Sequence, residues 1–485
     1  MLNCISGQKE KRIILTNQIS GGTVSESRAD VIVIGSGFAG LSAAIEAHNA
    51  GSSVVIIEKM HAPGGNSLIS DGGIAAAGTD EQKKAGITDS PGLFYKDMMK
   101  AGLGINHPEL VKTVTDNSRE AYEWLRDYIG VPFLEKIEIF GGHSVPRCFT
   151  PEGISGSVIV KKLIQKIKEK NIKIMFHTHF TGFIRDTGGK VIGVEVTENY
   201  NYKKGDTGRV RHITAGRAVI LAAGGFGSDI DFRSSQDPRL TEKIETTNQP
   251  SATSESLKAA LRIGSCPVHL SHIQLGPWAS PDEKGYGDGP SFSEYIVFQR
   301  GIVIDPDTGK RFANELADRK TLSDAILTAG HPCIGIADSA AVKNSGWNIE
   351  KCLKKGIVKQ FASIAELAAN YGISPSSLEN TIARFNSFVL EKADTDFKKP
   401  IIETASEIKT PPFYGIRLWP KVHFVMGGLL INKNAQVLDL NGKPIEGLYA
   451  AGEVTGGVHG ASRLGSCAIT ECIVLGRTAG IESAK

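Results

Sequence analysis

Residues 447–472 bring together side chains and backbone that could bind an anion. The stretch holds six glycines, one histidine and Arg463 in a short polar loop, and an apolar helical pattern follows it. The N-terminus of a helix attracts negative charge, because its free N–H groups and its dipole face that end. Arg463 lies at the same point, where a guanidinium can form two parallel hydrogen bonds to a carboxylate. The alternative interpretation is a glycine-rich connection that carries a surface arginine.

The start of the chain supplies a unit that could bind a nucleotide. Residues 29–34 predict a buried strand, residues 41–50 a helix, and residues 54–57 a second strand that ends at Glu58. The turn after the first strand has the GxGxxG pattern, and it consists of Gly35, Ser36, Gly37, Phe38, Ala39 and Gly40. In such units the glycines allow a tight turn, close approach to a pyrophosphate and helix packing, and the acid accepts the ribose hydroxyls. A dinucleotide site is therefore predicted, and a purely structural βαβ unit is the alternative.

Further small residues indicate which dinucleotide this unit binds. A second run after the first unit comprises Lys59, Gly64, Gly65, Asn66, Ser67, Gly72 and Gly73. Later, a strand-like run ends in Ala223, Gly224 and Gly225, and the loop near the C-terminus contains Gly452 and Glu453. In this order the motifs resemble the FAD-binding domain of the succinate dehydrogenase and fumarate reductase flavoproteins, and they span residues 29–481. The resemblance implies that these residues bind FAD.

The same resemblance implies a fold and a division into domains. The expected class is α/β, with a Rossmann-like FAD-binding domain that carries an inserted α+β capping domain. The expected parts are an N-terminal extension at 1–28, the FAD-binding domain at 29–268 and 422–485, and the capping domain at 269–421. A cap of this kind closes over the flavin and excludes water.

Three residues match catalytic motifs of the flavocytochrome-type fumarate reductases and of related reductases of α,β-unsaturated carboxylates. By this resemblance Arg319, which ends KRFANELADR, is the proton donor, and His423 of HFVMGG and Arg463 of HGASRLG hold the substrate carboxylate. Gly427 and Gly428 of the second motif are further substrate-site candidates. The implied reaction is hydride transfer from flavin N5 to one alkene carbon, with protonation of the carbon beside the carboxylate. An arginine is normally too weak an acid for this, so a dry site, a neighbouring guanidinium and a proton relay are needed.

The sequence departs from the fumarate-specific pattern where the far end of the substrate would lie. Gly276 stands at the position of a second carboxylate-binding histidine. A second carboxylate would then be buried without a partner, which is costly. Trp278, Tyr295 and Phe298 could line an apolar pocket for a monocarboxylate with a bulkier or aromatic tail, or they could be core residues of the cap.

The residues that would relay a proton to Arg319 have two alignments. Without a gap, Tyr295 and Phe298 occupy the positions of the relay glutamate and arginine. A small shift places Glu294 and Arg300 there instead. Both alignments stay open at this point.

The helix that follows Arg463 is expected to act on the cofactor. It begins near Ser466, and Ala468 and Ile469 lie in its first turn. Its N-terminus would face the pyrimidine edge of the flavin and favour the anionic reduced ring. Residues 66–78 contain no histidine in the context of a covalent flavin link, so noncovalent FAD is expected.

Length and composition bear on the class of protein. A chain of 485 residues predicts two or three domains, and a net charge of +3 gives no indication of a nucleic-acid partner. Seven scattered cysteines without a CxxC pair favour reduced thiols, with no metal site. No apolar run approaches the roughly 18 residues of a membrane helix. The printed N-terminus has no hydrophobic signal core and predicts a cytoplasmic location, with the bacterial periplasm open if a leader was removed.

Partners and competing functions follow from the motifs present. The expected substrate is a small unsaturated carboxylate. With no CxxCH haem motif, electrons are expected from a separate donor, such as a cytochrome c or a reduced flavin carrier. One alternative is an FAD-dependent dehydrogenase of the ketosteroid type, which would polarise a ketone with tyrosines and would not need Arg319, His423 and Arg463. Another is an electron-transfer flavoprotein subunit that only relays electrons.

Overall fold

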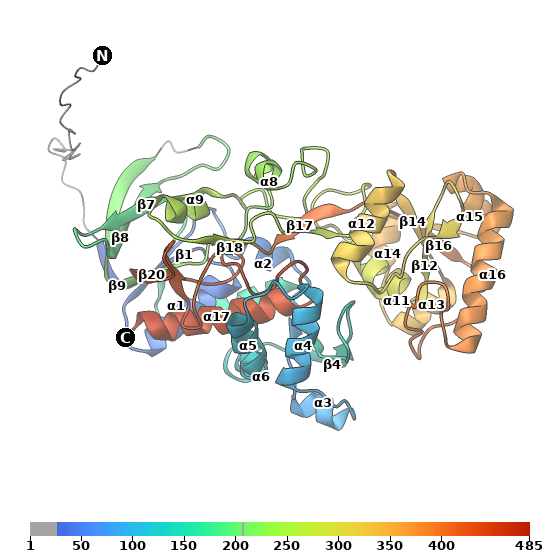
Figure 1. Ribbon diagram of the computed structural model, residues 1–485, viewed down its shortest axis with the longest axis horizontal. Helices are drawn as coiled ribbons and strands as arrows, with labels where there is room; N and C mark the ends of the chain where they lie inside the picture. The colour runs from blue at the N-terminus through green and yellow to red at the C-terminus, as the bar shows by residue number, and fades with distance from the viewer. Residues whose placement is uncertain (1–26, 206–207) are drawn as a thin grey trace, which may run out of the picture.

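The computed structural model describes residues 27–205 and 208–485. These residues form a larger and a smaller body that contact each other (Figure 1). At the start of the larger body, β1 (Ser27–Ile34), α1 (Phe38–Asn49) and β2 (Val54–Ile57) form the predicted nucleotide-binding unit. The two strands are parallel, with Val31 opposite Val54 and Ile34 opposite Ile57. The centre of β1 is apolar throughout because elements cover both faces of the sheet.

The larger body is built on an eight-stranded sheet. Its main path is β19-β20-β9-β1-β2-β6, and β8 and β7 extend from β9. The further strands are β6 (Lys173–Met175), β7 (Thr178–Arg185), β8 (Val191–Glu198), β9 (Arg209–Leu221), β19 (Gln436–Leu438) and β20 (Pro444–Ala450). Because β20 pairs in parallel with β9, the C-terminal part of the chain returns to the sheet that β1 begins. Motifs from both ends of the sequence therefore meet.

Helix α17 (Cys467–Ser483) packs directly against α1. A Cβ at Gly476 would lie 2.6 Å from the carbonyl oxygen of Ala39, and one at Gly480 would lie 2.3 Å from that of Ala43. Residue numbers rise together along the contact, so the helices are parallel and their N-termini face the same end of the sheet. The two glycines allow this backbone contact.

Shorter elements cover this sheet. They are α2 (Gly65–Ile69), β3 (Ile74–Ala75), α3 (Asp80–Lys84), α4 (Pro91–Ala101), α5 (Pro108–Asp116), α6 (Ser118–Glu123), the π-helix η1 (Trp124–Tyr128), β4 (Phe133–Glu138), β5 (Cys148–Pro151), α7 (Gly156–Glu169), α8 (Ile230–Gln236), α9 (Glu255–Arg262), β10 (Pro267–Val268) and β18 (Gly428–Leu429). Helices α5 and α6 contact α17, and α4 packs against α5 (Figure 1). Among the helices of the described residues, none is long and apolar enough to cross a lipid bilayer.

The smaller body has an antiparallel sheet of its own, in the order β13-β12-β14-β16-β15. Its elements are α10 (Gly289–Phe292), the π-helix η2 (Ser293–Val297), α11 (Phe298–Arg300), β12 (Ile302–Asp305), β13 (Lys310–Arg311), α12 (Arg319–Ala329), β14 (Cys333–Asp338), α13 (Ser339–Ser345), α14 (Glu350–Lys354), β15 (Val358–Phe361), α15 (Ile364–Tyr371), α16 (Pro375–Glu391) and β16 (Phe413–Leu418). Separate apolar clusters fill the two faces of this sheet. The predicted α/β class with an inserted α+β unit is confirmed.

The chain passes between the bodies through one pair of strands. It leaves the larger body along β11 (Ile273–Gly276) and returns along β17 (Lys421–Val425). The strands are antiparallel, with Ile273 opposite Val425. They lie next to the predicted boundaries at 268/269 and 421/422, which stay predictions.

The contact between α17 and α1 gives a stability prediction. Gly480→Val places a branched side chain where a Cβ already lies 2.3 Å from the Ala43 carbonyl oxygen. The helices must then separate, and we expect a loss of about 2–3 kcal/mol, measured as an earlier unfolding transition in denaturant. Ile481→Ala, at a neighbouring position that is 41% exposed, is the matched control and should unfold with the wild type. Equal midpoints for the two variants would contradict the packing argument.

Candidate active site

A cavity of about 910 Å³ lies at the carboxyl end of β1 and over the N-terminus of α1. This is where parallel α/β sheets bind nucleotides. Gly35 has a φ of +102°, and a Cβ there would lie 2.3 Å from the carbonyl oxygen of Ala222. Gly37 is the N-cap of α1. The backbone is therefore bare where a pyrophosphate must approach, and these residues fit a dinucleotide.

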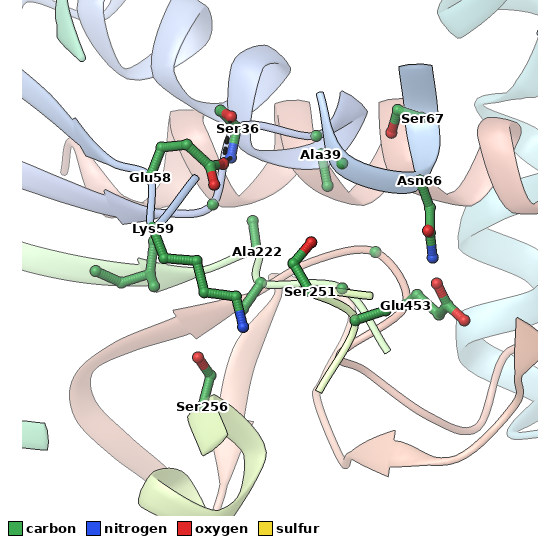
Figure 2. A pocket seen from close by; sticks show the side chains of 18 of the residues that line it. Ser36, Ala39, Glu58, Lys59, Asn66, Ser67, Ala222, Ser251, Ser256 and Glu453 are labelled. Carbon is green, nitrogen blue, oxygen red and sulfur yellow. Dashed lines mark hydrogen bonds between the residues drawn. The ribbon is translucent and has the colours of Figure 1, made fainter. Parts of the chain in front are cut away.

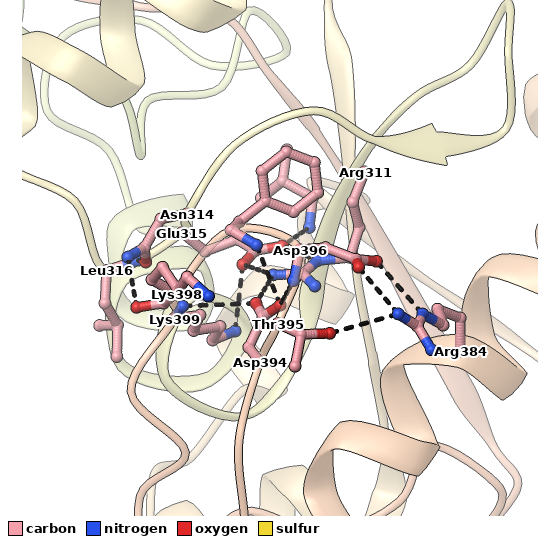
Figure 3. A network of polar contacts seen from close by, with 12 residues as sticks. Arg311, Asn314, Glu315, Leu316, Arg384, Asp394, Thr395, Asp396, Lys398 and Lys399 are labelled. Atoms are coloured by element: carbon pink, nitrogen blue, oxygen red, sulfur yellow. Dashed lines mark hydrogen bonds and ion pairs between the residues drawn. The ribbon is translucent and has the colours of Figure 1, made fainter.

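Most of the predicted cofactor residues line this cavity. They are Gly35, Gly37, Phe38, Ala39, Glu58, Lys59, Gly64, Gly65, Asn66, Ser67, Ala223, Gly224, Gly452 and Glu453. The carboxylate of Glu58 accepts hydrogen bonds from the backbone N–H and the hydroxyl of Ser36, at 3.2 and 2.5 Å (Figure 2). Its other oxygen accepts one from the Met60 N–H at 2.9 Å. These bonds fix the carboxylate at the edge of the cavity.

Three predicted cofactor residues, Gly40, Gly72 and Gly225, line neither this cavity nor the pocket described next. A Cβ at Gly40 would lie 2.1 Å from the Gly35 carbonyl oxygen, and one at Gly72 would lie 2.8 Å from the ring of Pro151. A Cβ at Gly225 would lie 2.6 Å from the carboxylate of Glu453. Each glycine therefore permits close packing behind the cavity wall.

A second cavity of about 790 Å³, here called the inner pocket, continues from the first. Five residues line both cavities: Phe38, Asn66, Ser67, Glu453 and Cys472. The three predicted catalytic residues line the inner pocket, with Arg319 at the start of α12, His423 on β17 and Arg463 in the loop before α17. The two cavities therefore form one continuous trough. The nucleotide-binding unit lines one end of the trough, and the side chains of Arg319, His423 and Arg463 line the other end.

Arg463 is a buried arginine without an acidic partner. It is 4% exposed, its Nη1 donates to the Leu464 carbonyl at 3.0 Å, and its guanidinium lies 4.6 Å from the centre of the Phe424 ring. Within residues 27–205 and 208–485 it forms no ion pair, and its buried Nε has no hydrogen-bond partner. Burial, and the charge of Arg319, lower the pKa of Arg463 to about 10. The carboxylates of Glu453 and Asp71 act on this guanidinium only from beyond ion-pair distance.

Buried charges behind the loop fix the position of Arg463. Arg147, which is 0% exposed, forms ion pairs with Asp89 at 2.9 Å and with Asp97 at 2.5 Å. Its Nη1 also donates to Nδ1 of His143 at 3.1 Å, which leaves the Nε2–H to donate to the Gly465 carbonyl at 2.9 Å. Burial and the charge of Arg147 lower the pKa of His143 to about 4, so this ring is neutral. The chain is thereby held two residues after Arg463.

His423 is a neutral imidazole in the inner pocket. Its Nδ1 lies 2.8 Å from the hydroxyl of Thr247, and its ring stands edge-on to Trp278 with centroids 4.6 Å apart. Burial lowers the pKa of His423 well below its usual value, and Arg463 and Arg319 lower it further. Nε2 is therefore the nitrogen left for a ligand.

Arg319 forms an ion pair with Glu294, whose carboxylate accepts its Nη2–H at 2.8 Å. Glu294 lies on η2, and π-helical turns are often found at functional sites. Burial opposes charge on Arg319, but Glu294 offsets this and raises the pKa of the guanidinium. Burial also raises the pKa of Glu294. Of the two alignments, the structure brings Glu294 to Arg319, whereas Arg300 donates to the Tyr295 carbonyl at 2.8 Å.

The predicted aromatic residues separate into one that lines the inner pocket and two that do not. Trp278 lines it, and a Cβ at Gly276 would lie 2.4 Å from this indole, so the glycine makes room for the ring. Tyr295 is buried, stacks on Trp347 at 4.0 Å and donates to Asp71 at 3.0 Å. Phe298 lines a separate small crevice, together with Glu294.

The N-terminus of α17 reaches the inner pocket. The predicted residues Gly73, Ser466, Ala468 and Ile469 line it. Ser466 is the N-cap, with a φ of +63° that is uncommon for a residue other than glycine. Gly427 and Gly428 do not line the pocket, because a Cβ at either would lie 2.2 Å from a carbonyl oxygen, that of His269 or that of Val454.

Several polar and aromatic residues of the inner pocket were not predicted. They are Asp71, Thr247, Asn248, Tyr286 and Phe424. Asn248 accepts a hydrogen bond of 2.5 Å from the predicted residue Asn66, and it lies in a segment without a motif. Of the five, Tyr286 and Phe424 had a signal in the sequence, since a glycine stands on each side of Tyr286 and Phe424 follows His423 within HFVMGG.

Comparison with known proteins places the chain in a family. The FAD binding domain family matches residues 30–469. The chain is 43% identical over 477 residues to the acrylate reductase flavoprotein subunit of Shewanella woodyi, covering 96% of this chain and 93% of that protein. It is 37% identical over 461 residues to a fumarate reductase (cytochrome) of Shewanella frigidimarina, covering 94% and 77%. The open conformation of a flavocytochrome c3 fumarate reductase matches with a TM-score of 0.75 at 30% identity, covering 94% of this chain and 78% of that one. The chain belongs to the FAD binding domain family, among the fumarate reductase and succinate dehydrogenase flavoproteins, and its cofactor is FAD.

Proposed function

We propose that the protein is an FAD-dependent reductase that saturates the C=C bond of an α,β-unsaturated monocarboxylate. The observation that carries this proposal is the buried guanidinium of Arg463, which has no acidic partner among the described residues. A buried charge without a partner is costly, and a bound carboxylate would provide the partner. The relatives named above are reductases of acrylate or fumarate, and both of these acids have a C=C bond beside a carboxylate.

Arg463 and His423 hold the carboxylate in this proposal. The guanidinium of Arg463 forms two parallel hydrogen bonds to it. If Nδ1 of His423 accepts the hydrogen bond of the Thr247 hydroxyl at 2.8 Å, Nε2–H donates to the same carboxylate. FAD supplies the hydride when it is bound in the trough. The guanidinium of Arg463 and the imidazole of His423 stabilise the negative charge that builds up beside the carboxylate during the reaction.

Arg319 gives the proton to the carbon next to the carboxylate, and Glu294 returns a proton to Arg319. The ion pair of 2.8 Å places the two groups in direct contact. Burial raises the pKa of the Glu294 carboxyl, which brings it toward the range of a working proton carrier. Glu294 also lines a small crevice, together with Arg319, Phe298 and Gln299. We infer that protons reach Glu294 from this crevice.

The preference for a single carboxylate follows from the wall opposite Arg463. Trp278 fills the space above Gly276, and its ring lies 5.4 Å from that of Tyr286. These aromatic groups suit an apolar tail, and Arg319, which lies 5.5 Å from the centre of the Trp278 ring, is already paired with Glu294. A ketosteroid-type site would not need an unpaired Arg463, and a pure electron relay would not need an acid pocket.

The electron supply is part of the proposal. We infer that FAD is bound noncovalently, because residues 66–78 contain no histidine that could form a covalent link. We also infer that a separate donor, such as a cytochrome c or a reduced flavin carrier, reduces the FAD, because the sequence contains no CxxCH haem motif.

Removing the guanidinium of Arg463 tests the acid-binding role. Arg463→Ala should lower the rate of reduction of acrylate or a substituted acrylate by about 100-fold or more, while FAD stays bound. The readouts are the oxidation of reduced methyl viologen and the flavin absorbance of the purified protein. Arg477→Ala, which removes a cation that pairs with Glu46 and Glu120, is the control and should keep normal turnover. Normal turnover in Arg463→Ala would refute the assignment.

The proton relay predicts a different effect for Glu294→Gln. The amide cannot return a proton to Arg319, so kcat should fall by about 100-fold with little change in KM and with a larger solvent deuterium isotope effect. Glu242→Gln, which changes an exposed acid outside the inner pocket, should leave both parameters unchanged. An unaltered kcat in Glu294→Gln would exclude this residue from the relay.

The aromatic wall predicts the substrate class. Fumarate should be reduced with a kcat/KM at least about 100-fold below that of the best monocarboxylate, since its second carboxylate would be buried without a partner. A panel of acrylate, crotonate, cinnamate and fumarate, assayed with photoreduced enzyme by flavin reoxidation, provides the comparison. Fumarate as the best substrate would contradict the assignment.

A further inference from the structure

An outer cavity that is open to solvent lies between residues 228–250 of the larger body and residues 284–287 of the smaller body. Four residues line both this cavity and the inner pocket: Ile69, Thr247, Asn248 and Tyr286. The two spaces therefore meet at these side chains. Tyr286 is the member of this group that belongs to the smaller body.

The loop that carries Tyr286 has a fixed base and glycine on both sides of the ring. The carboxylate of Glu283 accepts hydrogen bonds of 2.7 and 2.8 Å from the backbone N–H groups of residues 288–289, which closes the base. Gly285 and Gly287 have φ values of +67° and +72°. Glycine takes up left-handed and right-handed backbone conformations at similar cost. The phenol can therefore change position while the base of the loop stays in place.

The phenol of Tyr286 stands next to the proposed carboxylate site. Its ring centroid lies 5.4 Å from that of Trp278 and 6.1 Å from that of His423. Burial raises the pKa of Tyr286 well above its usual value, so the ring is neutral. Trp278 and Tyr286 are thus the aromatic side chains beside His423 that an acid bound to His423 and Arg463 would meet. Beyond the phenol lies the outer cavity.

On the basis of the proposed function, we propose that Tyr286 is the specificity-determining residue of the acid site. Its ring separates the inner pocket from the outer cavity and so limits the length of the substrate's tail. Without the ring, the outer cavity becomes available to a longer tail. This role depends on the size of the side chain and not on its hydroxyl group, so a phenylalanine at position 286 should fulfil it.

Binding of saturated acids tests this role without turnover. Propionate and 3-phenylpropionate are titrated into the oxidised, FAD-loaded protein, and Kd is obtained from the change in the flavin spectrum. Tyr286→Ala should improve binding of 3-phenylpropionate relative to propionate by at least about tenfold. Tyr286→Trp, which enlarges the ring, should change the ratio in the opposite direction. The kcat/KM ratio of cinnamate to acrylate should follow the same order.

Two controls separate ring size from other effects. Tyr286→Phe keeps the ring and Lys284→Ala changes the same loop, so both should keep the wild-type ratio within about twofold. An unchanged ratio in Tyr286→Ala and Tyr286→Trp, in proteins that bind FAD and acids normally, would overturn the role of Tyr286 and leave the proposed function intact. If the wild type neither binds nor reduces any acid, the proposed function fails, and this inference fails with it.

Discussion

Two arginine side chains face one pocket, and this electrostatic constraint underlies the rest of the site. Arg319 is neutralised by Glu294 at 2.8 Å, whereas Arg463 has no acidic partner among the described residues. Both cations, together with burial, keep His423 neutral. Arg463 is therefore the guanidinium with which a bound carboxylate would pair, because a buried charge without an ion-pair partner is costly.

The fold meets this constraint by bringing three distant segments together. His423 lies on β17, where the chain re-enters the larger body, and Arg319 begins a helix of the smaller body. Arg463 precedes α17, whose close contact with α1 fixes it against the nucleotide-binding unit. The buried Arg147 and His143 hold the same loop from behind. The acid site and the cofactor site are thus parts of one trough.

The sequence allowed prediction of those parts of the site that depend on local backbone geometry. The turn at Gly35 and Gly37, and the glycine-rich approach to Arg463, need particular residue types at particular spacings. Whether Glu294 or Tyr295 faces Arg319 could not be decided from the sequence, because consecutive helical residues point in different directions. The π-helix η2 settles the geometry by placing Glu294 on Arg319 and Tyr295 on Asp71. Thr247 and Tyr286 reach the pocket only through tertiary packing between the two bodies.

The most direct measurement is a crystal structure of the FAD-loaded protein with a saturated monocarboxylate such as propionate. The account predicts that the carboxylate oxygens lie within about 3.2 Å of the guanidinium of Arg463 and of Nε2 of His423. Arg319 should lie over the carbon chain and remain paired with Glu294. A carboxylate bound to Arg319 instead, or an acid found only in the outer cavity, would contradict it.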